Sequence, residues 1–214
     1  MAAGIPSRRE LEAALIERHG TLAHEKISRA HVAVAGLGGL GSNIAVNLAR
    51  LGVGRLRLID FDHVDISNLN RQQYAIRHLG MLKTDAMREI IAEINPYIEV
   101  DAECVTVDEH NAERLFAREQ IVCEAFDAPE NKALLVGALL EKCSGCVVVA
   151  ASGMAGYGSA NEIATRRRGG RLYLCGDGAT DIGPGTSLMA PRVSVCAGHQ
   201  ANMVLRLILG ETNP

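Results

Sequence analysis

The stretch that decides the fold is His31-Val-Ala-Val-Ala35, which runs directly into Gly36-Leu-Gly-Gly-Leu-Gly41. The first five residues form a short apolar run that predicts a buried parallel strand. The glycines have the spacing G-x-G-x-x-G, and a pattern typical of a helix follows as far as Arg50. Between a strand and a helix, the first glycine permits a tight turn, the second lets the backbone approach a phosphate, and the third lets helix and strand pack closely. The segment therefore predicts that a nucleotide phosphate binds at the N-terminus of this helix.

A second predicted strand, residues 55–59, ends at Asp60, which follows Gly36 by 24 residues. A carboxylate at this place is suited to accept hydrogen bonds from ribose hydroxyls. The glycine loop and Asp60 together indicate a bound nucleotide. They do not distinguish NAD, FAD and ATP.

Strand and helix patterns alternate along the rest of the chain as far as residue 151. This alternation predicts an α/β fold with a Rossmann-like, doubly wound, mostly parallel sheet flanked by helices. Ser7 and Glu10 have the spacing of a capping box, which predicts a short N-terminal helical segment. We expect one domain over residues 1–214, made of a helical arm (1–30), a nucleotide-binding core (31–151) and a last region (152–214) that ends in a helix. The further strands are expected at 98–105, 120–125, 146–151 and 171–175, and the further helices at 83–95, 109–118, 129–142 and 189–209.

Composition limits the classes of protein that fit. The formal net charge is -3, so a nucleic-acid partner, which needs a clear excess of Lys and Arg, is not expected. No apolar run approaches the roughly 18–20 residues of a membrane span, and the N-terminus lacks the apolar core of a secretory signal, so we expect a cytoplasmic protein. Of the six cysteines only Cys143 and Cys146 form a C-x-x-C pair. Because a four-cysteine zinc site needs two such pairs as a rule, we expect no zinc site.

The polar residues that follow Asp60 favour ATP. Asn68, Arg71 and Lys83 place an amide and two cations beyond the ribose-binding acid. The glycine loop already satisfies the pyrophosphate of NAD, so further cations imply the greater negative charge of a triphosphate. Arg clamps phosphate oxygens through its planar fork, and Lys acts as a point charge. An NAD-dependent oxidoreductase is the alternative, but the sequence offers no obvious acid/base pair for hydride transfer.

Four short motifs resemble those of the ThiF/MoeB/HesA family of adenylating enzymes, relatives of the ubiquitin-activating enzymes. They are G-L-G-G-L-G at 36–41, L-I-D-F-D at 58–62, S-N-L-N-R-Q at 67–72 and G-x-x-K at 80–83. The resemblance extends from about residue 18 to residue 209. Three later segments, which begin at Gly153, Leu174 and Met189, look like the short ThiF subfamily associated with thiamine thiazole synthesis.

The resemblance implies a role for each matching residue. The implied nucleotide-binding residues are Gly36, Gly38, Gly39, Gly41, Asp60, Asp62, Asn68, Arg71, Lys83 and Arg18, the last reaching the ATP of a partner subunit. The implied catalytic residues are Arg71, Lys83 and Asp127. Arg71 and Lys83 would stabilise charge as the α-phosphate is attacked, and Asp127 would bind magnesium.

The reaction implied by the resemblance is adenylation of a carrier protein. ATP would activate the C-terminal Gly-Gly carboxylate of a ubiquitin-like sulfur-carrier protein and release pyrophosphate, in thiamine thiazole biosynthesis. ATP and Mg²⁺ are the implied cofactors, the carrier is the implied partner, and a homodimer is the implied assembly. Other interpretations stay open at this point: a carrier of the molybdopterin or cysteine pathway, a small molecule or an RNA-linked carboxylate as the substrate, or a non-catalytic nucleotide-dependent module.

Three features of residues 152–214 invite more specific hypotheses. Some family members carry a loop cysteine that links covalently to the carrier; Cys175 is the nearest candidate here, although a partly buried strand cysteine is the preferred interpretation. The basic run Arg166-Arg167-Arg168 is expected in a solvated loop, with docking of an acidic carrier face as the alternative. The glycine-rich stretch 153–158 would let an extended carrier tail pass close to the backbone.

Overall fold

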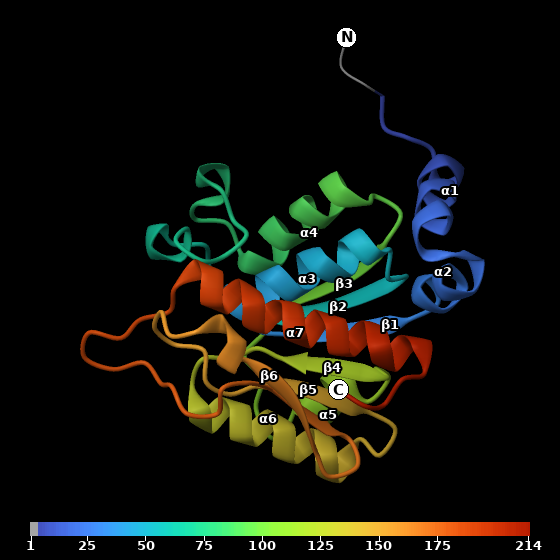
Figure 1. The fold of residues 1–214 in the computed structure, drawn as a ribbon. Helices are drawn as coiled ribbons and strands as arrows, with labels where there is room; N and C mark the ends of the chain where they lie inside the picture. Colours follow the sequence, from blue (N-terminus) through green and yellow to red (C-terminus); the bar gives the residue numbers. More distant parts are fainter. Residues whose placement is uncertain (1–3) are drawn as a thin grey trace.

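The computed structural model describes residues 4–214 and has one seven-stranded sheet between two layers of helices (Figure 1). The strand order is β3-β2-β1-β4-β5-β7-β6. All neighbours pair in parallel except β6 and β7, which are antiparallel. The strands are β1 (His31–Ala35), β2 (Arg55–Asp60), β3 (Glu99–Cys104), β4 (Ile121–Glu124), β5 (Val147–Ala151), β6 (Ala164–Arg168) and β7 (Leu172–Gly176). The predicted α/β, mostly parallel fold is confirmed.

Each face of the sheet packs against its own group of helices. One group is α3 (Gly39–Leu51), α4 (Lys83–Ile94) and α7 (Ala190–Leu209), and the other is α5 (Ala112–Phe116) and α6 (Pro129–Lys142) (Figure 1). Alternate residues of β1 serve the two layers, because successive side chains of a strand point to opposite faces. Val32 and Val34 belong to the first core, whereas Ala33 and Ala35 belong to the second, and all four are fully buried.

The strand order creates a switch point between β1 and β4. The chain leaves β1 through α3 toward β2 and β3, whereas it leaves β4 through α6 toward β5. In an open parallel sheet, the crevice beyond the carboxyl ends of two such strands is where ligands bind. The fold therefore places the glycine loop, which follows β1, beside the segment that follows β4.

The N-terminal arm is formed by α1 (Arg8–His19) and α2 (Thr21–Ser28). The predicted capping box is present: Ser7 N donates to Glu10 Oε2 at 2.8 Å, and Glu10 N donates to Ser7 Oγ at 3.3 Å. The Arg8 guanidinium stacks 5.3 Å from the centre of the Tyr97 ring, which joins α1 to the loop before β3. Residues 1–3, part of the predicted arm, lie outside the described residues.

The prediction was wrong at the basic run. Arg166, Arg167 and Arg168 lie in β6, an edge strand, and not in a solvated loop. Arg166 Nη1 donates to Gly176 O at 3.0 Å, and the Arg167 guanidinium lies 5.7 Å from the centre of the Tyr173 ring. Charged side chains on an edge strand hinder pairing with another chain, which is a physical reason for arginines at this place. The helix expected over 109–118 is also shorter, because α5 covers only Ala112–Phe116.

Three short 3₁₀ turns complete the fold: Ile66–Asn68, Ile76–His78 and Ala160–Glu162. Within residues 4–214, none of the helices combines the length and apolar character that crossing a membrane requires. Cys143 and Cys146 are buried in the core beneath α5 and α6. Over the same residues, no three His, Cys, Asp or Glu side chains gather as a set of metal ligands.

Candidate nucleotide site at the carboxyl ends of the strands

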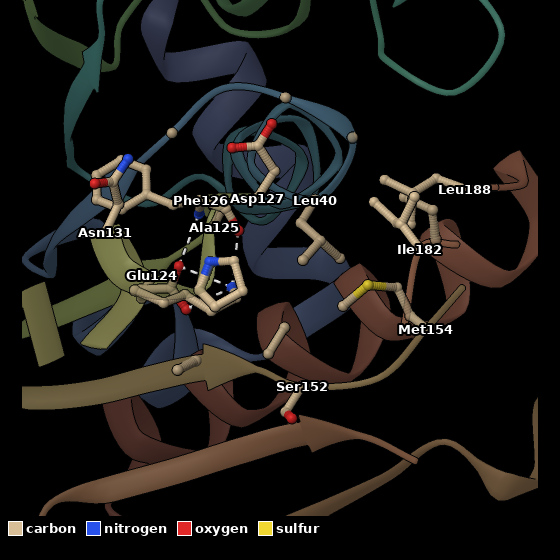
Figure 2. A pocket seen from close by; sticks show the side chains of 18 of the residues that line it. Leu40, Glu124, Ala125, Phe126, Asp127, Asn131, Ser152, Met154, Ile182 and Leu188 are labelled. Carbon is tan, nitrogen blue, oxygen red and sulfur yellow. Dashed lines mark hydrogen bonds and ion pairs between the residues drawn. The ribbon is translucent and has the colours of Figure 1, made fainter. Parts of the chain in front are cut away.

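A cavity of about 760 Å³ opens at the switch point. Its volume lies within the range of roughly 300–1,000 Å³ that small-molecule sites occupy. The walls come from the glycine loop, the ends of β2 and β4, the segment after β3, and the loops that follow β5 and β7. In Figure 2, Glu124, Phe126 and Asn131 lie on one side of the cavity, and the aliphatic side chains of Met154, Ile182 and Leu188 lie together on the other.

The glycine loop is held closed by contacts that only glycines allow. A Cβ on Gly41 would lie 1.8 Å from Gly36 O, so no side chain fits where α3 crosses the loop. Gly36 has φ of 89°, in the left-handed region, and a Cβ there would lie 2.8 Å from Ala125 O. At Gly38, by contrast, the nearest atom to an added Cβ is 3.8 Å away. Gly36 and Gly41 therefore build the loop, whereas Gly38 leaves room for a ligand beside the backbone.

Asp60 ties the end of β2 to the glycine loop. Its carboxylate accepts from Leu37 N at 2.6 Å and from Asp62 N at 2.8 Å. Tyr74 holds the next peptide group, on the other side of the same residue, because its hydroxyl donates to Leu37 O at 2.9 Å. Burial raises the pKa of Asp60 above its ordinary value, although Lys83 and the two N–H groups oppose this shift. Asp60 lines the cavity, and its hydrogen bonds shape the glycine loop; its binding of the ribose stays a prediction.

Lys83 and Asp62 form an ion pair in the cavity wall. Lys83 is the first residue of α4, and its Nζ lies 2.8 Å from Asp62 Oδ2. The lysine side chain is 7% exposed, whereas that of Asp62 is 49% exposed. The mostly buried lysine therefore lines the cavity with the carboxylate of Asp62 as its ion-pair partner, and that carboxylate is half exposed to water.

Arg71 and Asn68 lie on the loop that follows β2 and also line the cavity. Arg71 packs over the glycine loop, since a Cβ on Gly39 would lie 3.4 Å from Arg71 Cγ. Its Nη1 donates to Asn70 Oδ1 at 2.9 Å. The Asn68 side chain caps the local turn by accepting from Asp65 N at 3.0 Å. The structure brings both residues to the cavity that the glycine loop and Asp60 also line, and their contact with phosphates stays a prediction.

Asn43 anchors this loop to the first turns of α3. Its Nδ2 donates to Gly39 O at 2.6 Å and to Arg71 O at 3.2 Å, and its Oδ1 accepts from Gln73 Nε2 at 2.6 Å. These contacts join the two segments that carry the phosphate-binding candidates. Sequence reasoning did not single out Asn43, because a helical asparagine has no signature of its own.

Asp127 follows β4 and lines the cavity with an exposed carboxylate. Its Oδ1 accepts from Ala128 N at 2.8 Å. Proteins usually bind Mg²⁺ through one or two carboxylates together with substrate phosphates and water, so a single exposed carboxylate facing the cavity fits this ion.

The turn that presents Asp127 is braced by a buried ion pair that the sequence analysis missed. Glu124 is fully buried, and Lys132 Nζ donates to both of its carboxylate oxygens at 2.9 Å. Lys132 Nζ also donates to Phe126 O at 2.8 Å, and Phe126 N donates to Glu124 Oε1 at 2.7 Å. Burial raises the pKa of Glu124, against the effect of Lys132. The acid at the end of a buried strand, eight residues before a lysine in a helix, was the available signal.

Two predicted site residues, Gly41 and Arg18, lie away from the cavity walls, as does the loop-cysteine candidate Cys175. Gly41 is behind the glycine loop, and Arg18 is exposed on α1, which lies at the opposite end of the sheet (Figure 1). Cys175 is fully buried, and burial raises its pKa to about 11, although a contact with the Thr165 hydroxyl opposes this. The preferred interpretation of Cys175 as a strand cysteine is confirmed, because it lies in β7 beneath the loop and not on it.

Comparison with known proteins adds a family to this geometry. The model of the ThiF family matches residues 9–214. The chain belongs to the ThiF family. Adenylyltransferase and sulfurtransferase UBA4 of Candida glabrata is 33% identical to this ThiF-family chain over 136 residues, which are 63% of the chain and 31% of that protein. The tRNA threonylcarbamoyladenosine dehydratase of Bacillus subtilis is 46% identical over 93 residues, 43% of the chain and 37% of that protein.

The matched regions therefore span about a third of the length of these two curated relatives. Among solved structures, Escherichia coli tRNA N6-threonylcarbamoyladenosine dehydratase, TcdA, in complex with ATP superposes with a TM-score of 0.85. That likeness covers 97% of this chain and 98% of the other, at 22% identity. At this identity the likeness shows a shared fold over nearly the whole chain.

Proposed function

We propose that this ThiF-family chain uses ATP to adenylate a carboxylate and releases pyrophosphate. The observation that carries the proposal is the arrangement of one cavity: a glycine loop and Asp60 at the switch point, two cations beside them, and an apolar wall opposite. The first two features suit a nucleotide with several phosphates, and the third leaves space for a second substrate. The solved ATP complex of a structure with the same fold supports a nucleotide in this place.

Each polar residue has a task in this reaction. The N–H groups at Gly38 and Gly39 begin α3 and would bind phosphate oxygens. Asp60 would accept from the ribose. Lys83 would release Asp62 and turn its ammonium toward the phosphates, while Arg71 contributes its guanidinium from above the loop.

In this reaction the protein mainly orients the two substrates and stabilises negative charge. The carboxylate of the second substrate attacks the α-phosphorus, the bond to the bridging oxygen breaks, and pyrophosphate leaves, so no activated Ser or Cys is needed. Cations placed where negative charge develops stabilise the transition state. Asp127 would hold Mg²⁺, which neutralises phosphate charge when bound.

We propose a ubiquitin-like sulfur-carrier protein that ends in Gly-Gly as the second substrate. Beside Ser152, Thr180 and Asp181, the opposite wall presents small and apolar residues, which suit an extended peptide tail: Ala151, Gly153, Met154, Ala155, Ile182 and Leu188. The name of the relative from Candida glabrata, an adenylyltransferase and sulfurtransferase, points to the same kind of chemistry. Neither curated relative named above is a thiamine enzyme by name, so a carrier of another pathway is supported as well as a thiamine carrier. A homodimer in which Arg18 reaches the ATP of the partner subunit remains a prediction from the family resemblance.

A carboxylate linked to RNA is the second candidate, and the relative from Bacillus subtilis, named as a tRNA threonylcarbamoyladenosine dehydratase, favours it. Two observations weigh against it. The formal net charge is -3, and the wall opposite the glycine loop offers aliphatic side chains where a polynucleotide requires cations.

Pyrophosphate exchange tests the proposal. The protein is incubated with Mg²⁺, ATP, labelled pyrophosphate and either a ubiquitin-fold protein ending in Gly-Gly or tRNA that carries threonylcarbamoyladenosine. We expect label in ATP only with the Gly-Gly protein, and a loss of about 10²–10³-fold in the rate for Lys83→Ala, as for other electrostatic catalytic groups.

Lys142→Ala is the matched control, because Lys142 is exposed at the end of α6 and does not line the cavity. Exchange with tRNA alone would transfer the proposal to the second candidate. No exchange with either substrate, together with tight binding of NAD, would replace it with a dehydrogenase-like function.

A further inference from the structure

Arg192 joins the two loops that form the apolar wall. It lies in the first turn of α7 and is 4% exposed. Its Nη2 pairs with the carboxylate of Asp177, and its Nη1 donates to Ala155 O at 3.2 Å. Ala155 belongs to the loop after β5, and Asp177 begins the loop after β7. One guanidinium therefore fixes both loops to the same helix.

Asp177 organises the loop that it begins. Its carboxylate accepts from Ala179 N at 2.7 Å, from Thr180 N at 2.8 Å and from the Thr180 hydroxyl at 2.7 Å. The backbone of Asp177 also donates to Gly153 O at 2.9 Å, so the two loops are joined directly. Burial acts to raise the pKa of Asp177, but these hydrogen bonds and Arg192 lower it overall, so the carboxylate is charged and matches the guanidinium.

Two of the three glycines of 153–158 are explained by this ion pair. A Cβ on Gly153 would lie 2.0 Å from Asp177 Oδ1, and a Cβ on Gly158 would lie 2.7 Å from Arg192 Nη1. Gly153 also has φ of 80°, which side chains disfavour. These two glycines leave the space that the buried ion pair occupies. The sequence had suggested a different reason for them, the close passage of a carrier tail.

Arg192 and Asp177 do not line the cavity. The residues that follow them, Val193 and Gly178, do line it, and so does Ala155, which Arg192 contacts. The wall segments are 152–155 and 178–182, and Leu188 completes them. We infer that Arg192 and Asp177 are positioning residues that hold this wall in register for the acyl substrate, an extended peptide ending in a carboxylate. The inference rests on the proposed function, because that proposal places the nucleotide against the opposite wall.

The Arg192–Asp177 pair acts on the wall proposed for the acyl substrate, whereas the nucleotide is proposed to bind at the opposite wall. The nucleotide side is built by the glycine loop, Asp60 and α4; the hydrogen bonds and ion pairs of Arg192 go to the other loops, although the next residue, Val193, packs against Gly39. Because the polar contacts of Arg192 are with the wall segments, we expect loss of the ion pair to shift the wall that receives the peptide more than the nucleotide side. Because a displacement of about 1 Å can cost about 10²-fold in rate, the expected effect on the acyl substrate is roughly 10- to 100-fold in kcat/KM.

The test compares Arg192→Gln and Arg192→Lys with the wild-type chain, and uses Arg57→Gln as the matched control. Arg57 is also a mostly buried arginine in an ion pair, with Asp101 and Glu103 as its partners, but it lies on β2 and does not line the cavity. Pyrophosphate exchange is measured while the concentrations of ATP and of a ubiquitin-fold protein ending in Gly-Gly are varied separately. Hydrogen exchange of the amides of Ala179 and Thr180 is measured in the same samples.

We expect Arg192→Gln to raise the KM for the Gly-Gly protein about tenfold or more while the KM for ATP changes less than about twofold. The two amides should exchange about tenfold faster or more, because the carboxylate that they bind loses its cation. Arg192→Lys should recover part of both effects, and Arg57→Gln should show neither.

An equal rise of both KM values, or unchanged exchange of the two amides, would overturn the inference. If wild-type protein gives no pyrophosphate exchange with the Gly-Gly protein, the proposed function fails, and with it the role in acyl-substrate binding. The amide exchange would still decide whether Arg192 holds the loop.

Discussion

Replacing Lys132 with Met tests how the structure tolerates the buried carboxylate of Glu124. Lys132 Nζ makes three hydrogen bonds, two to Glu124 and one to Phe126 O, and Glu124 has no exposed surface. Removing one member of a buried ion pair costs about 3–5 kcal/mol, because the other charge is left without its partner. The lysine side chain is 23% exposed, so water relieves part of this, and we expect a loss of about 3 kcal/mol in the free energy of unfolding at pH 8.

The loss of stability caused by Lys132→Met should become larger as pH rises. Burial already raises the pKa of Glu124 above its ordinary value of 4.5, and loss of Lys132 raises it further. A carboxyl whose pKa is higher in the folded state binds a proton more readily there than in the unfolded chain. Stability therefore falls as pH rises from the unfolded pKa to the folded one, by at most about 1.4 kcal/mol per pH unit. In the variant the folded-state pKa of Glu124 is higher, so its stability continues to fall at pH values where that of wild type no longer does. The difference in the free energy of unfolding between variant and wild type should therefore grow between pH 5 and pH 8.

Urea unfolding of wild type, Lys132→Met and Lys142→Met at pH 5, 6, 7 and 8 measures the effect. Lys142 controls for loss of an exposed lysine from the same helix. The double variant Glu124→Gln/Lys132→Met should recover most of the stability, because it removes the charge together with its partner. A deficit that is equal at pH 5 and pH 8, or a double variant as unstable as the single one, would refute the reasoning.

Two further predictions concern the glycine loop and the thiols. Gly41→Ala should destabilise the fold by more than about 3 kcal/mol, because its Cβ meets Gly36 O at 1.8 Å, whereas Gly38→Ala should keep wild-type stability and lose ATP affinity. Thermal unfolding with and without ATP separates the two variants, and equal melting temperatures without ATP would contradict the account. In the native state only the thiol of Cys104 should react with iodoacetamide at pH 7.5, since the other five cysteines are buried. Rapid labelling of Cys175 as well would show that β7 opens more readily than its burial indicates.

The elements that build the nucleotide side could be predicted because each has a short-range signature. The glycine spacing fixes a turn by steric contact alone, and the contacts of Gly36 and Gly41 bear this out. Asp60 and Lys83 lie at the ends of elements whose periodicity is clear, so their place at one edge of the sheet follows from parallel pairing. Local pattern and three-dimensional position agree there.

The remaining features depend on partners that are distant in sequence. Arg192 meets Asp177 and Ala155 only because α7 returns across the sheet, and Glu124 is paired through a helix whose rotation the sequence did not specify. The strand β6 escaped prediction because three successive arginines do not alternate in polarity, and pairing with β7 decided its conformation. These contacts are tertiary, and no local propensity encodes them.

The two peptide groups that flank Leu37 are both held before any ligand arrives: Asp60 accepts from the Leu37 N–H, and the Tyr74 hydroxyl donates to the Leu37 carbonyl. Freezing one residue of backbone costs about 1–2 kcal/mol of conformational entropy, and here that cost is met when the chain folds. If a nucleotide binds as proposed, this part of the glycine loop is already ordered, so association should follow a single phase whose rate is proportional to nucleotide concentration, without a slower step in which the loop closes.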